Sequence, residues 1–131
     1  MSDSKHVAQI LAIDITTTEL ALAVRSADGA EGFASCKMRG ATLWREDSQY
    51  PGFRLEEVPG MIQHLLDELQ GKGWSFARPA SDPGYVSVSC RQHDMVVLDA
   101  DGRPLLPALM WKCNAATAEV QELRRLGVEA S

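Results

Sequence analysis

The stretch VAQILAIDITTTELALAVRSADGAEGFASCKM, residues 7–38, decides the fold. Two apolar segments, 7–15 and 20–25, are separated by three threonines, and a third segment of the same kind covers 32–38. Short runs rich in β-branched residues are typical of strands. The Asp-Gly pair at 28–29 lies between two of these runs and is a strong signal for a tight hairpin. We therefore predict a three-stranded antiparallel meander.

An amphipathic helix is predicted after residue 55. Its apolar side chains recur at offsets of 3, 4, 7, 8 and 11, which places them on one helical face: Val58, Met61, Ile62, Leu65, Leu66 and Leu69. Glu56 and Glu57 favour its N-terminal end. Gly71 and Gly73 favour its termination.

The second half of the chain predicts further α/β structure. Residues 40–52 and 77–84 have the composition of irregular connections, and 85–90 alternates as a strand does. Asp101-Gly102 predicts a hairpin between 95–98 and 104–110. A last helix is expected after Asn114 as N-cap, with Ala116, Val120 and Leu123 on its inner face and Gly127 at its end. The order of meander, helix, strand, hairpin and helix is α/β, and the chain stops without a closing element.

The composition indicates a soluble globular domain without a general affinity for anions. The 131 residues are 45% hydrophobic and 24% charged, with a net charge of −5. This balance argues against nucleic-acid or membrane partners. The first apolar stretch, 7–13, is too short to span a bilayer.

Three cysteines, Cys36, Cys90 and Cys113, are too widely spaced for a metal knuckle. We expect them to be reduced and mostly buried, which predicts a cytoplasmic protein.

The first motif with chemical potential is Asp14-Ile15-Thr16-Thr17-Thr18, at the end of the first predicted strand. A carboxylate at that position suits Mg²⁺, and a turn with hydroxyls and N–H groups suits phosphate oxygens. The same residues also fit an ordinary turn stabilised by local hydrogen bonds.

Two further motifs carry polar or aromatic groups after strands. Ser89 to Asp94 contains Arg91, Gln92 and His93, which can donate hydrogen bonds to the hydroxyls of a polyol; a solvated loop is the alternative. The run 97–111 ends in Trp111, which suits either stacking on a ligand or packing in the core.

Together, the three motifs resemble the FGGY family of carbohydrate kinases, within it the xylulokinases and glycerol kinases. The family's Asp-x-Gly-Thr-Thr corresponds to 14–18, its Gly-Gln-x-His loop to 90–93, and its Asp-x-x-Gly-x-Pro-Leu-x-Pro-Ala-Ile-x-Trp run to 99–111. The resemblance extends over about 7–126 and implies a ribonuclease H-like, actin-like ATPase fold. By length it corresponds to the N-terminal portion of the first kinase domain, an incomplete domain with the second domain absent.

The resemblance implies transfer of the ATP γ-phosphate to a sugar or polyol hydroxyl, with Mg²⁺. It places Asp14 near Mg²⁺ and the transferred group, though not as the base. It assigns ATP phosphates to Thr16, Thr17 and Thr18, and the sugar to Arg91, Gln92, His93 and Trp111. The base and the adenine pocket lie beyond this segment in the family, so we expect the 131 residues alone to be inactive.

Some positions depart from the family pattern. The motif glycine is Thr16, whose β-carbon hinders close approach of phosphate, and a basic residue that often follows the motif is Ala21. A degenerate kinase fold with a binding or regulatory role is therefore an alternative, and a stand-alone α/β domain is a third. The sequence leaves the oligomeric state open, a homodimer among the alternatives.

Overall fold

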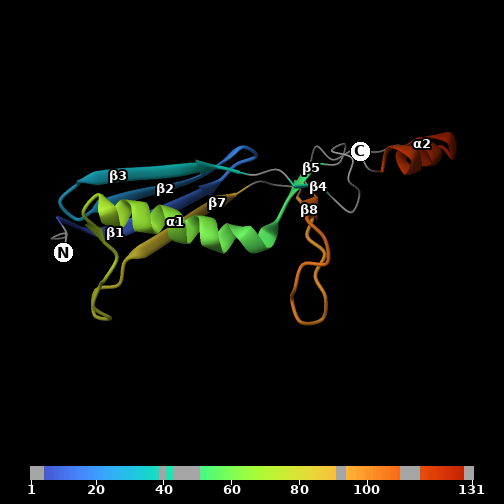
Figure 1. Cartoon of the computed structure of the whole chain (residues 1–131). Helices are drawn as coiled ribbons and strands as arrows, with labels where there is room; N and C mark the ends of the chain where they lie inside the picture. Colours follow the sequence, from blue (N-terminus) through green and yellow to red (C-terminus); the bar gives the residue numbers. More distant parts are fainter. Residues whose placement is uncertain (1–4, 39–40, 43–50, 91–93, 110–115, 129–131) are drawn as a thin grey trace. The chain divides into compact units, whose positions relative to one another are not determined.

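The computed structural model describes residues 5–38, 41–42, 51–90, 94–109 and 116–128 (Figure 1). The chain divides into two compact units. The first contains Met1–Arg39 and Glu56–Gln92, and the second contains Gly40–Leu55 and His93–Ser131.

A twisted sheet forms the first unit. Strands β1 (His6–Ile15), β2 (Glu19–Ser26) and β3 (Glu31–Lys37) pair antiparallel in sequence, which confirms the predicted meander. Strand β7 (Tyr85–Cys90) then lies parallel to β1 on the side away from β2. The parallel pair means that β1 and β7 end at the same edge of the sheet, which positions the segments that follow both strands.

The hairpin between β2 and β3 forms as the Asp-Gly pair predicts. Gly29 has a φ of 90°, a conformation that glycine adopts without strain. Its N–H donates to the carbonyl of Ser26 at 3.0 Å, and the Ser26 N–H donates to the Ala30 carbonyl at 2.9 Å.

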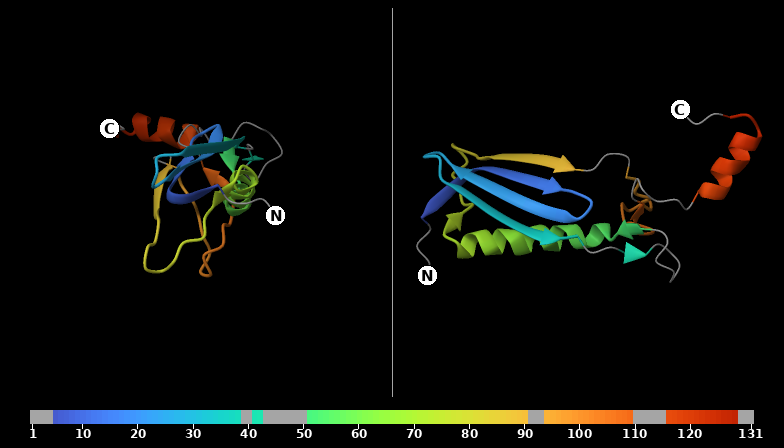
Figure 2. Two further views of the ribbon diagram at one scale, coloured as in Figure 1. Left: turned by 90° about the vertical axis from the view of Figure 1, so that its left-hand side faces the viewer. Right: turned by 90° about the horizontal axis from the view of Figure 1, so that it is seen from above.

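The core of the first unit lies between the sheet and helix α1 (Val58–Gly71), which a short 3₁₀ turn, η1 (Leu55–Glu57), precedes. Alternate residues of β2, Leu20, Leu22 and Val24, are buried beneath it, and Leu65 and Leu69 of α1 are fully buried. The views in Figure 2 show α1 running along the sheet. Each such side chain contributes about 1.5–3 kcal/mol, and the helix and its predicted apolar face are confirmed.

A short strand that sequence patterns did not predict, β6 (Trp74–Ser75), pairs parallel with the start of β1. Gly73 precedes it with a φ of 97°, which turns the chain sharply after α1. The Trp74 side chain is buried and packs closely over Gly32 of β3, since a Cβ built on Gly32 would lie 2.4 Å from Trp74 Nε1. Trp74 therefore closes one end of the core.

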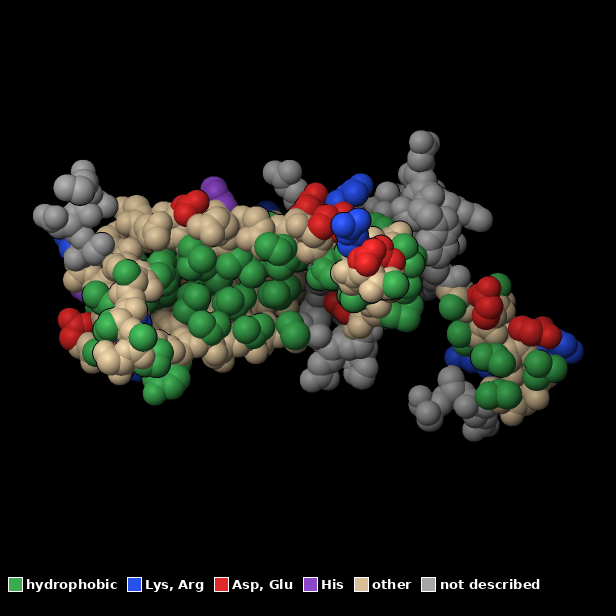
Figure 3. All heavy atoms as spheres, turned by 90° about the horizontal axis from the view of Figure 1, so that it is seen from below, with side chains coloured by type: hydrophobic (Ala, Val, Ile, Leu, Met, Phe, Trp, Pro, Cys, Tyr) green, Lys and Arg blue, Asp and Glu red, His purple; other side chains and the backbone are tan. Residues whose placement is uncertain are grey.

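Part of the helix-facing side of the sheet is not covered by α1. The helix packs on β2, β3 and β6. Val86 and Val88 of β7 are in register with Leu11 and Ile13 of β1 and share the face of the buried β2 residues. They are 66% and 60% exposed. Figure 3 shows hydrophobic side chains gathered over this unit seen from below.

The second unit contains a small sheet of three short strands in the order β4 (Ala41–Thr42), β5 (Pro51–Phe53) and β8 (Ala108–Leu109). Because β4 and the first two residues of β5 lie within 40–52, the prediction of wholly irregular structure there was wrong. Two segments that lack regular patterning pair with each other and with β8, a long-range effect that local pattern does not reveal.

The predicted hairpin around Asp101-Gly102 is present as isolated bridges. Met95 pairs with Leu109, and Leu98 pairs with Pro104. The Asp99 carboxylate accepts the N–H groups of Asp101 and Arg103, both at 2.9 Å, so its role is to hold the turn.

Helix α2 (Thr117–Arg125) is confirmed, but its start differs from the prediction. Ala116 is the N-cap and has no side-chain capping bond; Asn114 lies outside the described residues. The expected inner face is not buried, since no residue of α2 is buried. Gly127 ends the helix with a φ of 80°, as predicted.

The cysteines also differ from expectation. Cys36 is half-buried and Cys90 is exposed, and both are free. Cys90 is exposed because β7 is uncovered; Cys113 lies outside the described residues. No helix in the described parts of the chain is long and apolar enough to cross a membrane.

Candidate functional site

Asp14 lies one residue before the end of β1 and its side chain is exposed. It is in register with Ala21 of β2 on one side and with Ser89 of β7 on the other, so all three share one face of the sheet. Within the described parts of the chain the Asp14 carboxylate makes no hydrogen bond or ion pair. An exposed carboxylate of this kind is a suitable oxygen ligand for a hard cation.

Thr16 closes the turn between β1 and β2 with both its backbone and its side chain. Its N–H donates to the Glu19 carbonyl at 2.8 Å, and its hydroxyl donates to the same oxygen at 3.0 Å. The same Oγ1 accepts the Glu19 N–H at 3.0 Å and the Thr18 N–H at 3.4 Å. The hydroxyl thus accepts hydrogen bonds from two backbone N–H groups of the turn.

Thr17 and Thr18 form the tip of this turn. Thr17 is half-buried and Thr18 is exposed. The Thr18 carbonyl accepts the N–H of Met38 at 2.8 Å, which ties the turn to the end of β3. The tip is therefore held by backbone bonds on both sides.

The second predicted motif begins at the same edge of the sheet. In the parallel β1–β7 pair, Asp14 is in register with Ser89 and Ile15 with Cys90. Arg91, Gln92 and His93 follow Cys90 directly but lie outside the described residues. Chain order and register therefore bring the starts of the first two motifs together.

The third motif is only partly described. Its hairpin, including Pro104, belongs to the second unit, whereas Trp111 lies outside the described residues.

Two residues at this end of the sheet have no role assigned from the sequence. Ser89 lies beside Asp14 in register, and Lys37 of β3 pairs with Glu19, the residue that receives the Thr16 bonds. Only the register of the sheet places Lys37 beside Glu19, because the two residues are 18 apart in the sequence. Among the described residues, no group of three or more His, Cys, Asp or Glu side chains is arranged to hold a metal ion.

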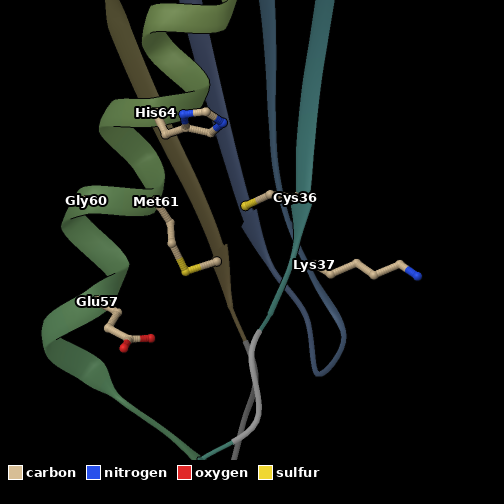
Figure 4. Close-up of a pocket in the computed structure, with 6 residues that line it drawn as sticks. All are labelled: Cys36, Lys37, Glu57, Gly60, Met61 and His64. Carbon is tan, nitrogen blue, oxygen red and sulfur yellow. The ribbon is translucent and has the colours of Figure 1, made fainter.

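A hollow of about 590 Å³ lies between α1 and β3, and none of the predicted site residues lines it (Figure 4). Cys36 and His64 point into it from opposite sides, whereas Lys37 points away. Burial, and then the charges of Glu19 and Glu68, raise the pKa of the Cys36 thiol. The thiol is therefore a poor nucleophile.

Comparison with known proteins shows a match to the FGGY family of carbohydrate kinases, N-terminal domain, over residues 9–131. No curated protein sequence matches significantly.

Three solved structures illustrate the fold. Gluconate kinase from Lactobacillus acidophilus matches with a TM-score of 0.70 and 18% identity, over 90% of this chain and 22% of that one. Xylulose kinase from Rhodospirillum rubrum gives 0.68 and 21%, over 88% and 23%. Plasmodium falciparum glycerol kinase with ADP gives 0.67 and 12%, over 93% and 24%. The chain thus spans less than a quarter of these structures, and at this identity the likeness shows the actin-like ATPase fold.

Proposed function

Because the chain belongs to the FGGY family of carbohydrate kinases, as its N-terminal domain, we propose that it is part of an ATP-dependent kinase that phosphorylates a sugar or polyol hydroxyl. The observation that carries the proposal is the exposed Asp14 at the end of β1, directly before the threonine turn. The solved structures that share the fold are gluconate, xylulose and glycerol kinases, which supports a small polyhydroxylated substrate.

In this proposal the threonine turn faces the ATP phosphates, and Asp14 holds Mg²⁺ directly or through water. Phosphoryl transfer depends mainly on positioning and on neutralising charge. Arg91, Gln92, His93 and Trp111 are assigned to the sugar. This assignment follows the family resemblance, supported by the register that brings the end of β7 beside Asp14.

The residues present fit Mg²⁺ and phosphate only in part. The exposed carboxylate of Asp14 is a suitable oxygen ligand for Mg²⁺, which keeps several waters when bound. The Thr16 hydroxyl, however, already takes the N–H groups of Thr18 and Glu19. The turn therefore offers phosphate fewer backbone donors than a glycine at this position would allow.

That partial fit favours a second candidate, a kinase-fold domain that binds ligand without turnover. Ala21 supports this second candidate as well. It lies beside Asp14 in the sheet, at the position where the family often has a basic residue. The two candidates differ in catalysis and not in fold.

The test is sugar-dependent release of ADP. The 131-residue chain and any longer polypeptide that carries it are assayed with Mg²⁺, ATP and a panel of pentoses, hexoses and polyols. We expect no turnover by the chain alone and sugar-dependent turnover by the longer polypeptide. Absence of turnover by the longer polypeptide with every sugar would leave the binding role, and turnover by the chain alone would contradict its proposed inactivity.

A further inference from the structure

The end of the sheet that carries the threonine turn is acidic. Asp14 and Ala21 are in register and share one face, and Glu19, two residues from Ala21 on β2, lies on the same face. Both acidic side chains are exposed. The N–H groups of Thr18 and Glu19 are already bonded to the Thr16 hydroxyl. Because the phosphates of ATP are negatively charged, a positive charge beside this turn favours their binding.

Lys37 is the basic residue that the sheet places beside this turn. It is in register with Glu19, and residues opposed in an antiparallel pair share one face. The residue after it, Met38, donates its N–H to the Thr18 carbonyl at 2.8 Å. The Lys37 side chain is exposed and points away from the hollow between α1 and β3 (Figure 4). Lys37 therefore lies on the face that carries Asp14.

The other basic side chains in the described part of the first unit lie nearer the opposite end of the sheet. Lys5 precedes β1, and Arg25 is in register with Ile10 near the β2–β3 hairpin. Lys72 Nζ donates to the Phe33 carbonyl at 3.0 Å, and Arg78 Nη1 donates to the Ala8 carbonyl at 3.1 Å. Within these residues, Lys37 is thus the one cation at the end with the threonine turn.

Small side chains lie between Lys37 and Asp14 on this face. Ala21 is in register with Asp14 on one side and with Ser35 on the other, and Ser35 is two residues before Lys37. A lysine has a flexible four-carbon stem and binds phosphate as a point charge without a fixed geometry. The stem of Lys37 therefore has an unobstructed path over Ala21 and Ser35 toward a phosphate group beside Asp14.

We propose that Lys37 is a phosphate-binding residue that supplies the positive charge at the threonine turn. This inference rests on the proposed function, since it takes the turn to face ATP. The Lys37 ammonium offsets the charges of Asp14 and Glu19 and attracts the phosphates. A role confined to the sheet is the rival explanation, because Lys37 and Glu19 also form an opposite-charge cross-strand pair.

An NMR titration of the ¹⁵N-labelled intact chain with Mg–ATP tests the proposal. Lys37→Met, which keeps the stem and removes the charge, should weaken binding roughly fivefold, whereas Lys37→Arg should bind as the wild type does. The matched control is Arg25→Met. Arg25 is exposed on the same face and in register with Glu31, as Lys37 is with Glu19, but at the other end of the sheet. This control should leave the affinity unchanged.

Acetylation of lysine amines gives a second readout, which needs no substitution. The chain is treated with an N-hydroxysuccinimide ester of acetate with and without Mg–ATP, and peptide mass spectrometry gives the rate at each lysine. Mg–ATP should slow the acetylation of Lys37. Lys72, whose side chain is 51% exposed, is the internal control and should react at an unchanged rate. Mg–AMP, which lacks the β- and γ-phosphates, should protect Lys37 less than Mg–ATP does.

The outcomes separate this inference from the proposed function. If the wild type binds Mg–ATP at the threonine turn, and Lys37→Met binds it equally well, Lys37 acts only within the sheet and the inference fails alone. Equal losses of affinity in Lys37→Met and Arg25→Met would overturn it as well, because they would reflect net charge. A wild-type chain without Mg–ATP shifts at the turn would overturn both proposals. Circular dichroism checks that each variant is folded.

Discussion

The hydroxyl of Thr16 accepts the backbone N–H of Glu19 at 3.0 Å and donates to the carbonyl of the same residue at 3.0 Å. One side chain thus satisfies both backbone groups of Glu19 at the first turn of the sheet. This pairing stabilises the hairpin and, at the same time, occupies N–H donors of the turn that we propose to face phosphate. It is the physical basis for expecting a weakened phosphate site.

Removing this hydroxyl should loosen the turn. In Thr16→Val the side chain keeps its shape but loses the bonds to Glu19, so the Glu19 amide should exchange faster with solvent. The net cost of such hydrogen bonds is about 1 kcal/mol in the free energy of unfolding. Amide exchange by NMR and urea unfolding measure the two effects, and Thr16→Ser is the control that keeps the hydroxyl. Equal exchange in both variants would show that the bond does not protect this amide.

The packing of Trp74 over Gly32 predicts opposite effects of two glycine-to-alanine changes. A Cβ on Gly32 would lie 2.4 Å from Trp74 Nε1 and 3.0 Å from Val24 Cγ2. Gly32→Ala should therefore destabilise by about 1–3 kcal/mol. Gly60 of α1 has no atom within 4 Å of an added Cβ, and Gly60→Ala should stabilise the helix by about 0.5–1 kcal/mol. Urea unfolding measures both, and equal stabilities would contradict this description of the core.

The two described cysteines should differ in reactivity. Burial chiefly, with the charges of Glu19 and Glu68, raises the pKa of Cys36, whereas Cys90 is exposed at the end of β7. In a Cys113→Ser background at neutral pH, iodoacetamide should alkylate Cys90 faster than Cys36, by roughly tenfold. Peptide mass spectrometry gives the two rates, and denatured protein, in which the difference should vanish, is the control. Faster reaction at Cys36 would be inconsistent with its environment.

The hairpin between β2 and β3 should contribute a pH-dependent part of the stability. The hydroxyl of Ser26 and then the N–H of Ala30 donate to the Asp28 carboxylate and lower its pKa. A lowered folded pKa means that this stabilisation is complete above about pH 4, the range of an unfolded aspartate, and is lost as pH falls through the lower folded value.

Thermal melts of wild type and Asp28→Asn between neutral and strongly acidic pH test this sign. The difference in Tm should be largest at neutral pH and should shrink in acid. In a Ser26→Ala background, which lacks the main donor to the Asp28 carboxylate, the Tm difference caused by Asp28→Asn at neutral pH should be smaller. A Tm difference that grows in acid would contradict the claim that the ionised Asp28 carboxylate stabilises the hairpin.

The sequence predicted the elements whose causes are local. The meander follows from short apolar runs and the Asp28-Gly29 turn, and α1 follows from the spacing of Leu65, Leu69 and their neighbours. Strand β6 was not predicted, because two residues of strand depend on pairing with the start of β1 and on burial of Trp74. Strands β4 and β5 were missed for the same reason.

The candidate site was predicted in part. The sequence identified Asp14 and the threonines through the motif, but it could not show that the Thr16 hydroxyl is used within the turn. Nor could it place Ser89 and Lys37 near them, because sheet register brings these residues together from distant segments. The roles assigned to Arg91, Gln92, His93 and Trp111 remain predictions.

The central claim is that the threonine turn binds the phosphates of ATP and that Thr16 lowers its affinity for them. An NMR titration of the ¹⁵N-labelled chain with Mg–ATP tests this claim most directly. We predict that amide shifts are concentrated at Asp14, Thr17 and Thr18 and that they are lost in Asp14→Asn. In Thr16→Gly the apparent Kd for Mg–ATP should be roughly tenfold lower, which corresponds to about 1.4 kcal/mol of binding free energy. Shifts that are absent in all three proteins, or equally large at the Asp28-Gly29 hairpin, would contradict the account.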